Sequence, residues 1–469
     1  MKKVSLILLV LLLLLPTAVF PAAAESAAID CVYLSDLAAK DVFPINWIAS
    51  NATFDERPLL VCGYPLEKGV SMHPTQAEKE AYIEYDISAY SYDTFTAVVG
   101  KQDQTKDKKV TMIVYVDGVE KYNSGVVSNG FLDYCTVDIK GAKSIKLYIT
   151  DGGDGYASDM TSWGYPCLFN GADLKIASIE LIGVSHYAVL GQEMDYSCGK
   201  LLVTYNTGAF EEVALDVVEI TGYDKNTAGV QALTVSYGGV SAEHRVLVSD
   251  TLAHVADLEW VESSMFAGYN GGKASKDGMD IDGLPLAIAG KVCCKSIFTC
   301  PLNVKDAEDS AAGITVDLSG KGYTRFCAHV GKTRQAFAKS AKAIYSIYGD
   351  GRLLAQSPEV YCGEDTWFDV DITGVSRLQL VVTHGGDGVN ADWTAWDDAV
   401  VYAEAKADET TAAPVTTAAP ETTTAQHPVT EAPVSTPDTA DHRQAVMLTA
   451  AGLAAALAVL AAANAKKKN

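Results

Sequence analysis

The chain has 469 residues, with 36 Lys and Arg against 59 Asp and Glu, so its formal net charge is −23. An acidic surface of this size repels phosphate backbones, which excludes nucleic acid as a partner. The length allows two to four domains.

The first residues have the order of a secretory leader. Met1 is followed by two lysines, then by a nearly continuous apolar run that ends at Leu15, and then by three alanines, Ala22 to Ala24. A basic start, an apolar run and small residues are typical of a signal peptide. We therefore predict that residues 1–24 are a signal peptide and that the protein is extracellular.

Two stretches of the chain are nearly the same. Residues 147–165 read LYITDGGDGYASDMTSWGY, and residues 380–398 read LVVTHGGDGVNADWTAWDD. Both pass from an apolar segment into Gly-Gly-Asp-Gly, followed by an Asp and by a Trp four residues later. Further matches precede each stretch in the same order. This internal repeat predicts a duplicated domain, at residues 30–173 (module 1) and 255–405 (module 2).

The segments inside each module are short and alternate polar with apolar residues, as in SIKLYIT and RLQLVVT. Turn residues interrupt them about every ten residues, which is typical of an all-β sandwich. We predict a jelly-roll-like sandwich for each module and a smaller immunoglobulin-like sandwich for residues 175–250. The ten cysteines do not recur between the modules, so a hydrophobic core rather than a shared disulfide must define the fold.

The last part of the chain changes composition. Residues 407–440 are mostly Thr, Ala and Pro, which cannot form a core, and we predict an extended stalk. Residues 445–463 carry no charge and would span ~28 Å as a helix, the thickness of a bilayer core. Lysines follow. We therefore predict a membrane-spanning anchor with a basic tail, which faces the cytoplasm.

This layout resembles that of Gram-positive wall-anchored proteins. Pro437-Asp438-Thr439-Ala440-Asp441 resembles the sortase motif, although Thr436 and Ala440 depart from the Leu and Gly of that motif. Thr439 is then the candidate cleavage residue. The alternative is a plain single-span membrane anchor.

The repeated glycine-rich loop contains acids that suit a metal ion. Carboxylates and main-chain carbonyls are the hard oxygen ligands that Ca²⁺ prefers. The candidate ligands are Asp151, Asp154 and Asp159 in module 1 and Asp387 and Asp392 in module 2. The alternative is an ordinary Asx and glycine turn between strands.

Aromatic residues near these acids suit a sugar. An aromatic face packs against C–H groups, while acids and amides accept hydroxyl protons. The candidate carbohydrate-binding residues are His73, Tyr156, Trp163, Trp393 and Trp396. A tryptophan in a β-sandwich is more often a core residue, which is the stronger interpretation for Trp163 and Trp396. For His73 the alternative is a structural histidine.

The sequence offers little for catalysis. It contains no His-Glu-x-x-His and no Gly-x-Ser-x-Gly motif. Paired acids are expected in any chain this acidic, so they do not indicate a glycosidase. After three β domains are assigned, no segment is left for a catalytic domain. We predict that the protein is not an enzyme.

The duplicated domain resembles the NPCBM family, which is named for carbohydrate binding and overlaps carbohydrate-binding module family 51. The segments of module 1 that carry the resemblance are Gly69–Pro74, Phe95–Gly100, Val116–Gly118, Val137–Gly141 and Leu147–Trp163. Module 2 departs from the pattern where Cys300 replaces His73 and His384 replaces Asp151. The middle segment resembles the group 3 bacterial Ig-like domain, which usually acts as a spacer.

The resemblance implies a surface protein that binds galactose-type sugars, or host or dietary glycans. The acids of the repeated loop add calcium as the expected cofactor. Two modules on one chain would raise avidity. The alternative is a structural or protein-adhesive surface protein whose modules bind no sugar.

Overall fold

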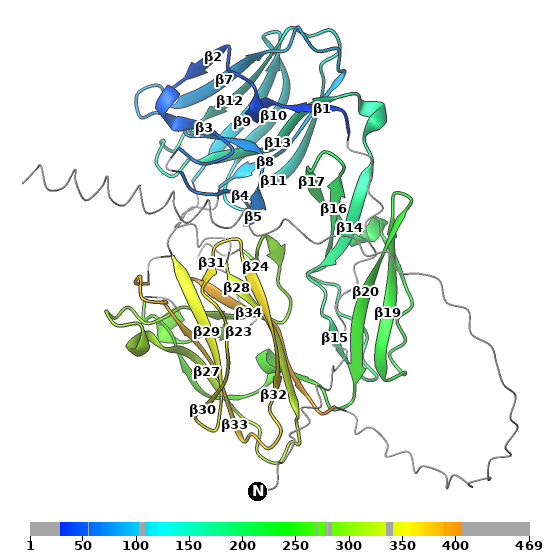
Figure 1. Ribbon diagram of the computed structural model, residues 1–469, viewed down its shortest axis with the longest axis vertical. Helices are drawn as coiled ribbons and strands as arrows, with labels where there is room; N and C mark the ends of the chain where they lie inside the picture. The colour runs from blue at the N-terminus through cyan, green and yellow to red at the C-terminus, as the bar shows by residue number, and fades with distance from the viewer. Residues whose placement is uncertain are drawn as a thin grey trace, which may run out of the picture. The chain divides into compact units, whose positions relative to one another are not determined.

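The computed structural model describes residues 29–404, apart from residues 55, 103–107, 269, 277–278, 280–283, 334–340 and 390. This part of the chain is all-β, as predicted, with strands and short 3-10 helices (Figure 1). The predicted signal peptide, stalk, membrane anchor and Thr439 lie outside the described residues. Among the residues that are described, no helix is long and apolar enough to cross a membrane.

Module 1 consists of two antiparallel sheets around one core (Figure 1, blue to cyan and teal). The first sheet has the order β11-β8-β13-β6-β3, with β1 also paired to β13, and the second has the order β10-β9-β12-β7-β2. The strands of the first sheet are β1 (Cys31–Tyr33), β3 (Ile48–Ser50), β6 (Gly69–Met72), β8 (Thr94–Lys101), β11 (Leu132–Asp138) and β13 (Thr161–Phe169). Those of the second are β2 (Asp41–Phe43), β7 (Glu80–Asp86), β9 (Val110–Val116), β10 (Val119–Val127) and β12 (Ser144–Thr150); β4 (Leu59–Val61) and β5 (Tyr64–Leu66) form a separate pair.

Module 2 repeats this arrangement strand for strand. Its first sheet has the order β23-β26-β34-β28-β32, with β21 paired to β34, and its second has the order β22-β27-β33-β29-β30. The strands of the first sheet are β21 (Ala253–His254), β23 (Ser275–Lys276), β26 (Ile297–Thr299), β28 (Arg325–Lys332), β32 (Asp365–Asp371) and β34 (Thr394–Tyr402). Those of the second are β22 (Trp260–Ser264), β27 (Ala312–Asp317), β29 (Lys342–Gly349), β30 (Arg352–Gln356) and β33 (Arg377–Thr383); β31 (Val360–Tyr361) pairs with β29, and β24 (Ala287–Ile288) with β25 (Lys291–Val292).

The alternating sequence explains the sandwich. In β12, Ile145, Leu147 and Ile149 are buried while the residues between them are partly exposed. Because successive side chains of a strand point to opposite faces, one face of β12 enters the core. Strand β33 shows the same pattern. Burial of these apolar side chains supplies the main driving force for the fold.

The same hairpin turn recurs in both modules. Asp117 and Gly118 connect β9 to β10 and have positive φ angles of 47° and 79°. Asp350 and Gly351, between β29 and β30, have φ angles of 51° and 80°. Asp-Gly is the dipeptide that such a two-residue turn favours. The recurrence of this turn supports the register of the sequence repeat.

The segment between the modules is a smaller sandwich with its own core. One sheet has the order β14-β16-β17 and the other β15-β20-β19-β18, with β15 parallel to β20. The strands are β14 (Ile176–Ile182), β15 (Tyr187–Val189), β16 (Lys200–Tyr205), β17 (Phe210–Ala214), β18 (Glu219–Thr221), β19 (Gly229–Tyr237) and β20 (Val240–Ser249).

The 3-10 helices are short and connect strands. They are η1 (Leu34–Asp36), η2 (Ile45–Trp47), η3 (Gly171–Asp173), η4 (Leu215–Val217), η5 (Val255–Asp257), η6 (Asn270–Gly272) and η7 (Glu308–Ser310).

Strand register brings the glycine-rich loop together with other chain segments. Thr161, which follows the loop, pairs with Lys101 at the end of β8 and with Met72 at the end of β6. The residues just beyond these three strand ends therefore share one end of module 1. We call this the loop end of module 1, and the equivalent end of module 2, where Thr394 pairs with Lys332 and Thr299, the loop end of module 2.

Candidate functional site

Four rings from separate segments meet at the loop end of module 1. His73 follows β6, Trp47 ends η2, Phe54 lies beyond β3, and Tyr156 lies in the glycine-rich loop. The ring centroids of Trp47 and His73 are 5.0 Å apart, and those of Trp47 and Phe54 are 4.8 Å apart. The His73 ring is 6.2 Å from both Phe54 and Tyr156, edge to face. We call these four residues the aromatic cluster.

His73 is held as a neutral imidazole. Its Nδ1 lies 2.7 Å from the carbonyl oxygen of Pro74, so Nδ1 carries the proton and donates it. Burial lowers the pKa of His73, and the nearby charge of Lys101 lowers it further. Among the described residues, no hydrogen bond engages Nε2. With Nδ1 as donor, Nε2 presents a lone pair that can accept a hydroxyl proton.

The aromatic cluster has one open member. The Trp47 side chain is 38% exposed, while His73 is buried and Phe54 and Tyr156 are partly buried. An accessible indole fixed by two neighbouring rings offers a flat apolar face next to the acceptor of His73. This combination can hold a ring that has C–H groups on one face and hydroxyl groups at its edge.

The residue that begins the glycine-rich loop, Asp151 in module 1 and His384 in module 2, makes the same kind of hydrogen bond in both modules. Asp151 Oδ1 accepts a hydrogen bond of 3.0 Å from the Gly153 amide. In module 2, His384 Nδ1 accepts one of 3.0 Å from the Gly386 amide. A side-chain acceptor that bonds the amide two residues on stabilises a tight turn. The Asp-to-His replacement therefore preserves the turn.

The second acid of the loop also recurs in role. Asp154 Oδ1 lies 3.4 Å from the Lys109 amide, and Asp387 Oδ2 lies 3.2 Å from the Lys342 amide. Each carboxylate thus contacts the start of the neighbouring strand, β9 or β29. These contacts fit an ordinary Asx and glycine turn, which the sequence analysis left open as the alternative to a calcium site.

The third acid differs between the modules. In module 2, Asp392 and Lys332 form an ion pair of 2.7 Å, and both side chains are fully buried. In module 1, Lys101 instead donates to the carbonyl oxygens of Lys108 and Ser158, at 2.8 and 3.0 Å. Asp159 is fully buried, and neither of its oxygens has a hydrogen-bond partner among the described residues. Burial raises the pKa of Asp159 to about 7, although Lys101 opposes this rise.

Comparison with protein families gives the same division of the chain. The NPCBM/NEW2 domain matches residues 30–168 and 252–402, which is more than half of the chain. The chain belongs to the NPCBM/NEW2 family. The group 3 bacterial Ig-like domain matches residues 185–248, between the two modules. Both sequence resemblances are confirmed.

Solved structures with similar folds include modules from glycan-active bacterial proteins. The CBM51 of Clostridium perfringens GH95 in complex with methyl-galactose is 26% identical and covers 29% of this chain and 99% of its own, with a TM-score of 0.27. The tandem CBM51 modules of a Streptococcus pneumoniae family 98 glycoside hydrolase are 17% identical and cover 80% and 99%, with a TM-score of 0.27.

A third structure joins such modules to an enzyme. The M60 catalytic domain with two CBM51 domains of Clostridium perfringens ZmpB is 23% identical, with a TM-score of 0.28. The alignment covers 80% of this chain and 38% of that one, so this chain spans well under half of the larger protein. A comparison with curated proteins finds no match.

The loop end of the second NPCBM module lacks the aromatic cluster's histidine. Cys300, in the position of His73, is buried, and burial raises the pKa of its thiol to about 12. Trp393 is also buried, with 7% of its surface exposed. Neither side chain offers an open face or a neutral imidazole acceptor.

The structure places all three candidate tryptophans in hydrophobic cores, which agrees with the stronger interpretation of Trp163 and Trp396 and differs from the sugar-binding expectation for Trp393. Trp163 and Trp396 are completely buried and belong to the hydrophobic cores of modules 1 and 2, because each lies on the inward face of a central strand. Trp393 belongs to the core of module 2 as well. None of them can serve as a platform for a sugar. Of the predicted sugar-binding residues, His73 and Tyr156 are brought together.

Sequence reasoning missed Trp47 and Phe54. Both residues lie outside the repeated motifs. The one signal that could have indicated them is an aromatic residue within a polar turn, Pro44-Ile45-Asn46-Trp47. It also missed the buried lysines. These could have been found, since Gly100-Lys101 and Gly331-Lys332 occupy matching places at the ends of β8 and β28.

The calcium expectation remains untested. Across the described ranges, no group of three or more His, Cys, Asp or Glu side chains is placed to hold a metal ion. Asp151, Asp154 and Asp387 already accept main-chain hydrogen bonds. The carboxylate of Asp159 is the one of the three candidate acids of module 1 that has no such bond.

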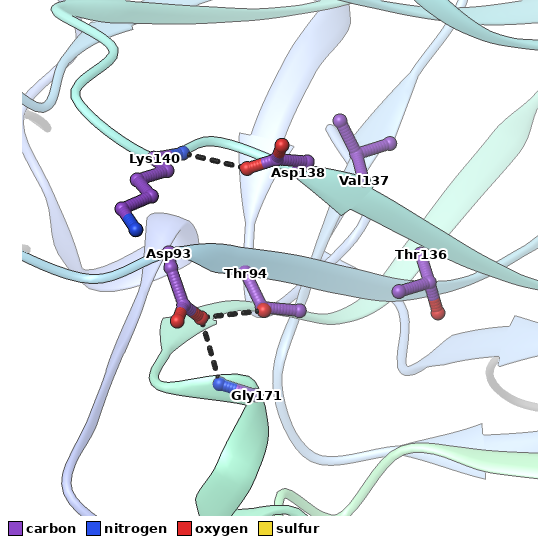
Figure 2. A pocket seen from close by; sticks show the side chains of 7 residues that line it. All are labelled: Asp93, Thr94, Thr136, Val137, Asp138, Lys140 and Gly171. Carbon is purple, nitrogen blue, oxygen red and sulfur yellow. Dashed lines mark hydrogen bonds between the residues drawn. The ribbon is translucent and has the colours of Figure 1, made fainter.

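A shallow pocket of about 340 Å³ lies at the other end of module 1 (Figure 2). Asp93 accepts hydrogen bonds from the Thr94 hydroxyl and the Gly171 amide, at 2.7 and 2.8 Å. In module 2, the Thr324 hydroxyl accepts from the Glu404 amide in the corresponding place. The polar groups of this pocket therefore fasten the chain after the last strand, and we assign the pocket a structural role.

Proposed function

We propose that this chain is a non-catalytic glycan-binding protein of the cell surface and that its sugar site is the aromatic cluster of module 1. The observation that carries the proposal is the partly exposed Trp47 indole, 5.0 Å from the ring of the neutral His73. The family match supports the same class of ligand.

The chemistry of the site suits a pyranose. The C–H face of a sugar ring would stack on Trp47, and a hydroxyl at its edge would donate to His73 Nε2. Binding sites of this kind combine an apolar wall with a few placed polar groups. Tyr156, on the other side of His73, adds a ring and a phenol that can donate or accept.

Galactose-type sugars are the first ligands to test, because the family resemblance implies them. Module 2 differs at the equivalent position, where Cys300 is buried. We therefore assign binding to module 1 and a structural role to module 2. We propose that the modules lie outside the cell, attached to the membrane or the cell wall, because a leader and a C-terminal anchor are predicted from the sequence.

Asp159 is the residue at which we propose that calcium binds. A cation near this buried carboxylate would supply a partner for its oxygens, which have none among the described residues, while module 2 uses Lys332 for the same purpose. The ion would stabilise the loop that carries Tyr156 rather than contact the sugar. Binding is therefore measured both with Ca²⁺ and with a chelator.

A glycan array with the 25–405 fragment tests the proposal. We expect selective binding that is lost in Trp47→Ala and His73→Ala and is kept in Cys300→Ala, the matched change in module 2. Folding of each variant is checked by circular dichroism. An array without any binding by folded protein would favour the alternative, a structural or protein-adhesive surface protein, and would overturn the proposal.

A further inference from the structure

Two cysteines lie diagonally across the pairing of β1, the first strand of module 1, with β13, its last strand. In the pairing of β1 with β13, Cys31 is opposite Phe169 and Tyr33 is opposite Cys167. Residues that are opposite each other or two apart on a strand share a face of the sheet. Cys31 and Cys167 are thus diagonal neighbours on one face, and the right-handed twist of a sheet brings one diagonal of each such pair closer.

In module 2 the equivalent two positions are both apolar and buried. His254 is opposite Val400 there, as Tyr33 is opposite Cys167 in module 1. Leu252, two residues before His254, therefore takes the place of Cys31. Leu252 and Val400 are buried in one hydrophobic cluster. These two positions thus belong to one apolar cluster in module 2, and in module 1 both of them are thiols.

The two thiols lie close enough to shift each other's pKa. The neighbouring Cys167 lowers the pKa of Cys31 to about 7, and Cys31 together with burial raises that of Cys167. Cys31 is partly exposed, while Cys167 is completely buried. Cys31 is thus the more accessible and the more easily ionised of the two thiols, and Cys167 is the protected one. This is the arrangement of an attacking and a resolving cysteine.

We propose that Cys31 and Cys167 form a disulfide that fastens the first strand of module 1 to its last strand. The oxidant is an external disulfide, such as that of an extracellular oxidoreductase. The Cys31 thiolate attacks one sulfur of this disulfide, forms a mixed disulfide and releases one thiolate. Cys167 then loses its proton to water and attacks the Cys31 sulfur, which releases the second thiolate. The two cysteines are oxidised, and the external disulfide is reduced to two thiols.

The disulfide would act on the unfolded chain. It would close a loop that spans nearly the whole of module 1, and a cross-link over so long a loop removes much of the entropy of unfolding. Strand β1 has only three residues and pairs with β13 alone. The disulfide therefore stabilises the strand at which the module most easily begins to open, in the compartment where such bonds persist.

The test treats the full chain, with its thiols reduced, with glutathione disulfide and maps the peptides without reduction. We expect a cross-linked peptide that contains Cys31 and Cys167. We also expect the melting temperature of module 1 to be higher by about 5–10 °C in the oxidised than in the reduced protein. A glutathione adduct that persists on Cys31, or an oxidised protein that melts with the reduced one, would overturn the proposal.

Two variants separate the disulfide from general thiol effects. Cys31→Leu with Cys167→Val copies the pair of module 2, so it should fold and should melt at the same temperature with and without oxidant. If the double variant fails to fold, Cys31→Ser, at the partly exposed position, takes its place and should also melt at the same temperature with and without oxidant. Cys135→Ala changes another buried cysteine of module 1 and should keep the full shift. A shift that survives in the first two variants contradicts the assignment.

Discussion

The loop ends of the two modules share the same hydrogen bonds to the main chain but differ in the side chains around them. Both glycine-rich loops use their first side chain to bond an amide two residues on, and both use their second acid to contact a neighbouring strand. Beyond these bonds the modules diverge. Module 1 gathers His73 and Trp47, and within the part of the chain that the structure describes its Asp159 carboxylate accepts no hydrogen bond, whereas module 2 buries Cys300 and pairs Asp392 with Lys332.

This difference separates the features that stabilise the fold from those that can bind a ligand. The recurring hydrogen bonds belong to the turn, because they persist even where Asp151 is replaced by His384. The features that do not recur are the ones that can give module 1 a binding site. Duplication copied the loop, and among the residues that the structure describes, the loop end of module 1 has a partly exposed aromatic ring beside a neutral histidine, whereas that of module 2 has the buried Cys300 in the place of this histidine.

The largest effect is expected from the ion pair of module 2. Lys332→Met leaves the Asp392 carboxylate buried without its partner, and breaking such a pair costs about 3–5 kcal/mol. Urea unfolding of the 25–405 fragment should show an earlier transition for module 2. The double change Lys332→Met with Asp392→Leu should restore most of the loss. A single variant as stable as the wild type would contradict the assigned role of the pair.

The sugar site gives the next largest effect. Trp47→Ala removes the stacking face and should weaken sugar binding at least roughly tenfold, which corresponds to about 1.4 kcal/mol. Titration calorimetry with the sugar found on the array measures this change. Trp367→Ala, which removes an exposed tryptophan of module 2, serves as the control and should leave the affinity unchanged.

The shared turn predicts equal effects in the two modules. Gly153 and Gly386 have φ angles of +89° and +99°, and an added Cβ would meet no atom within 4 Å at either position. The cost of Gly153→Ala or Gly386→Ala is therefore the backbone strain alone, about 1 kcal/mol. Unfolding of the two variants should reveal matching losses, each in its own module. Unequal losses would show that the loops are not equivalent.

The smallest effect concerns pH. The pKa of Asp159 is raised by burial to about 7 in the folded chain, so the folded state holds this proton more tightly than the unfolded state. Its contribution to stability is complete below the ordinary carboxyl pKa and is lost as the pH rises through about 7. Asp159→Asn should therefore raise the melting temperature of module 1 at pH 8 and leave it unchanged at pH 4. An equal change at both pH values would exclude Asp159 as the titrating group.

The sequence predicted the architecture well because the repeat and the alternation of side chains are local signals. Strand β12 and its copy β33 could be recognised from their own residues. The site was harder to predict, because its members come from separate segments that only the strand register brings together. Trp47 had no partner in the repeat, while Trp163 and Trp396 stood out through recurrence, which in their case reflects the shared core.

The most direct test of the account is the number of sugar molecules bound per chain. Titration calorimetry of the 25–405 fragment should give one site, and His73→Ala should abolish it while Cys300→Ala should not. Two equal sites, or one site that survives His73→Ala, would contradict the assignment of glycan binding to the aromatic cluster of module 1.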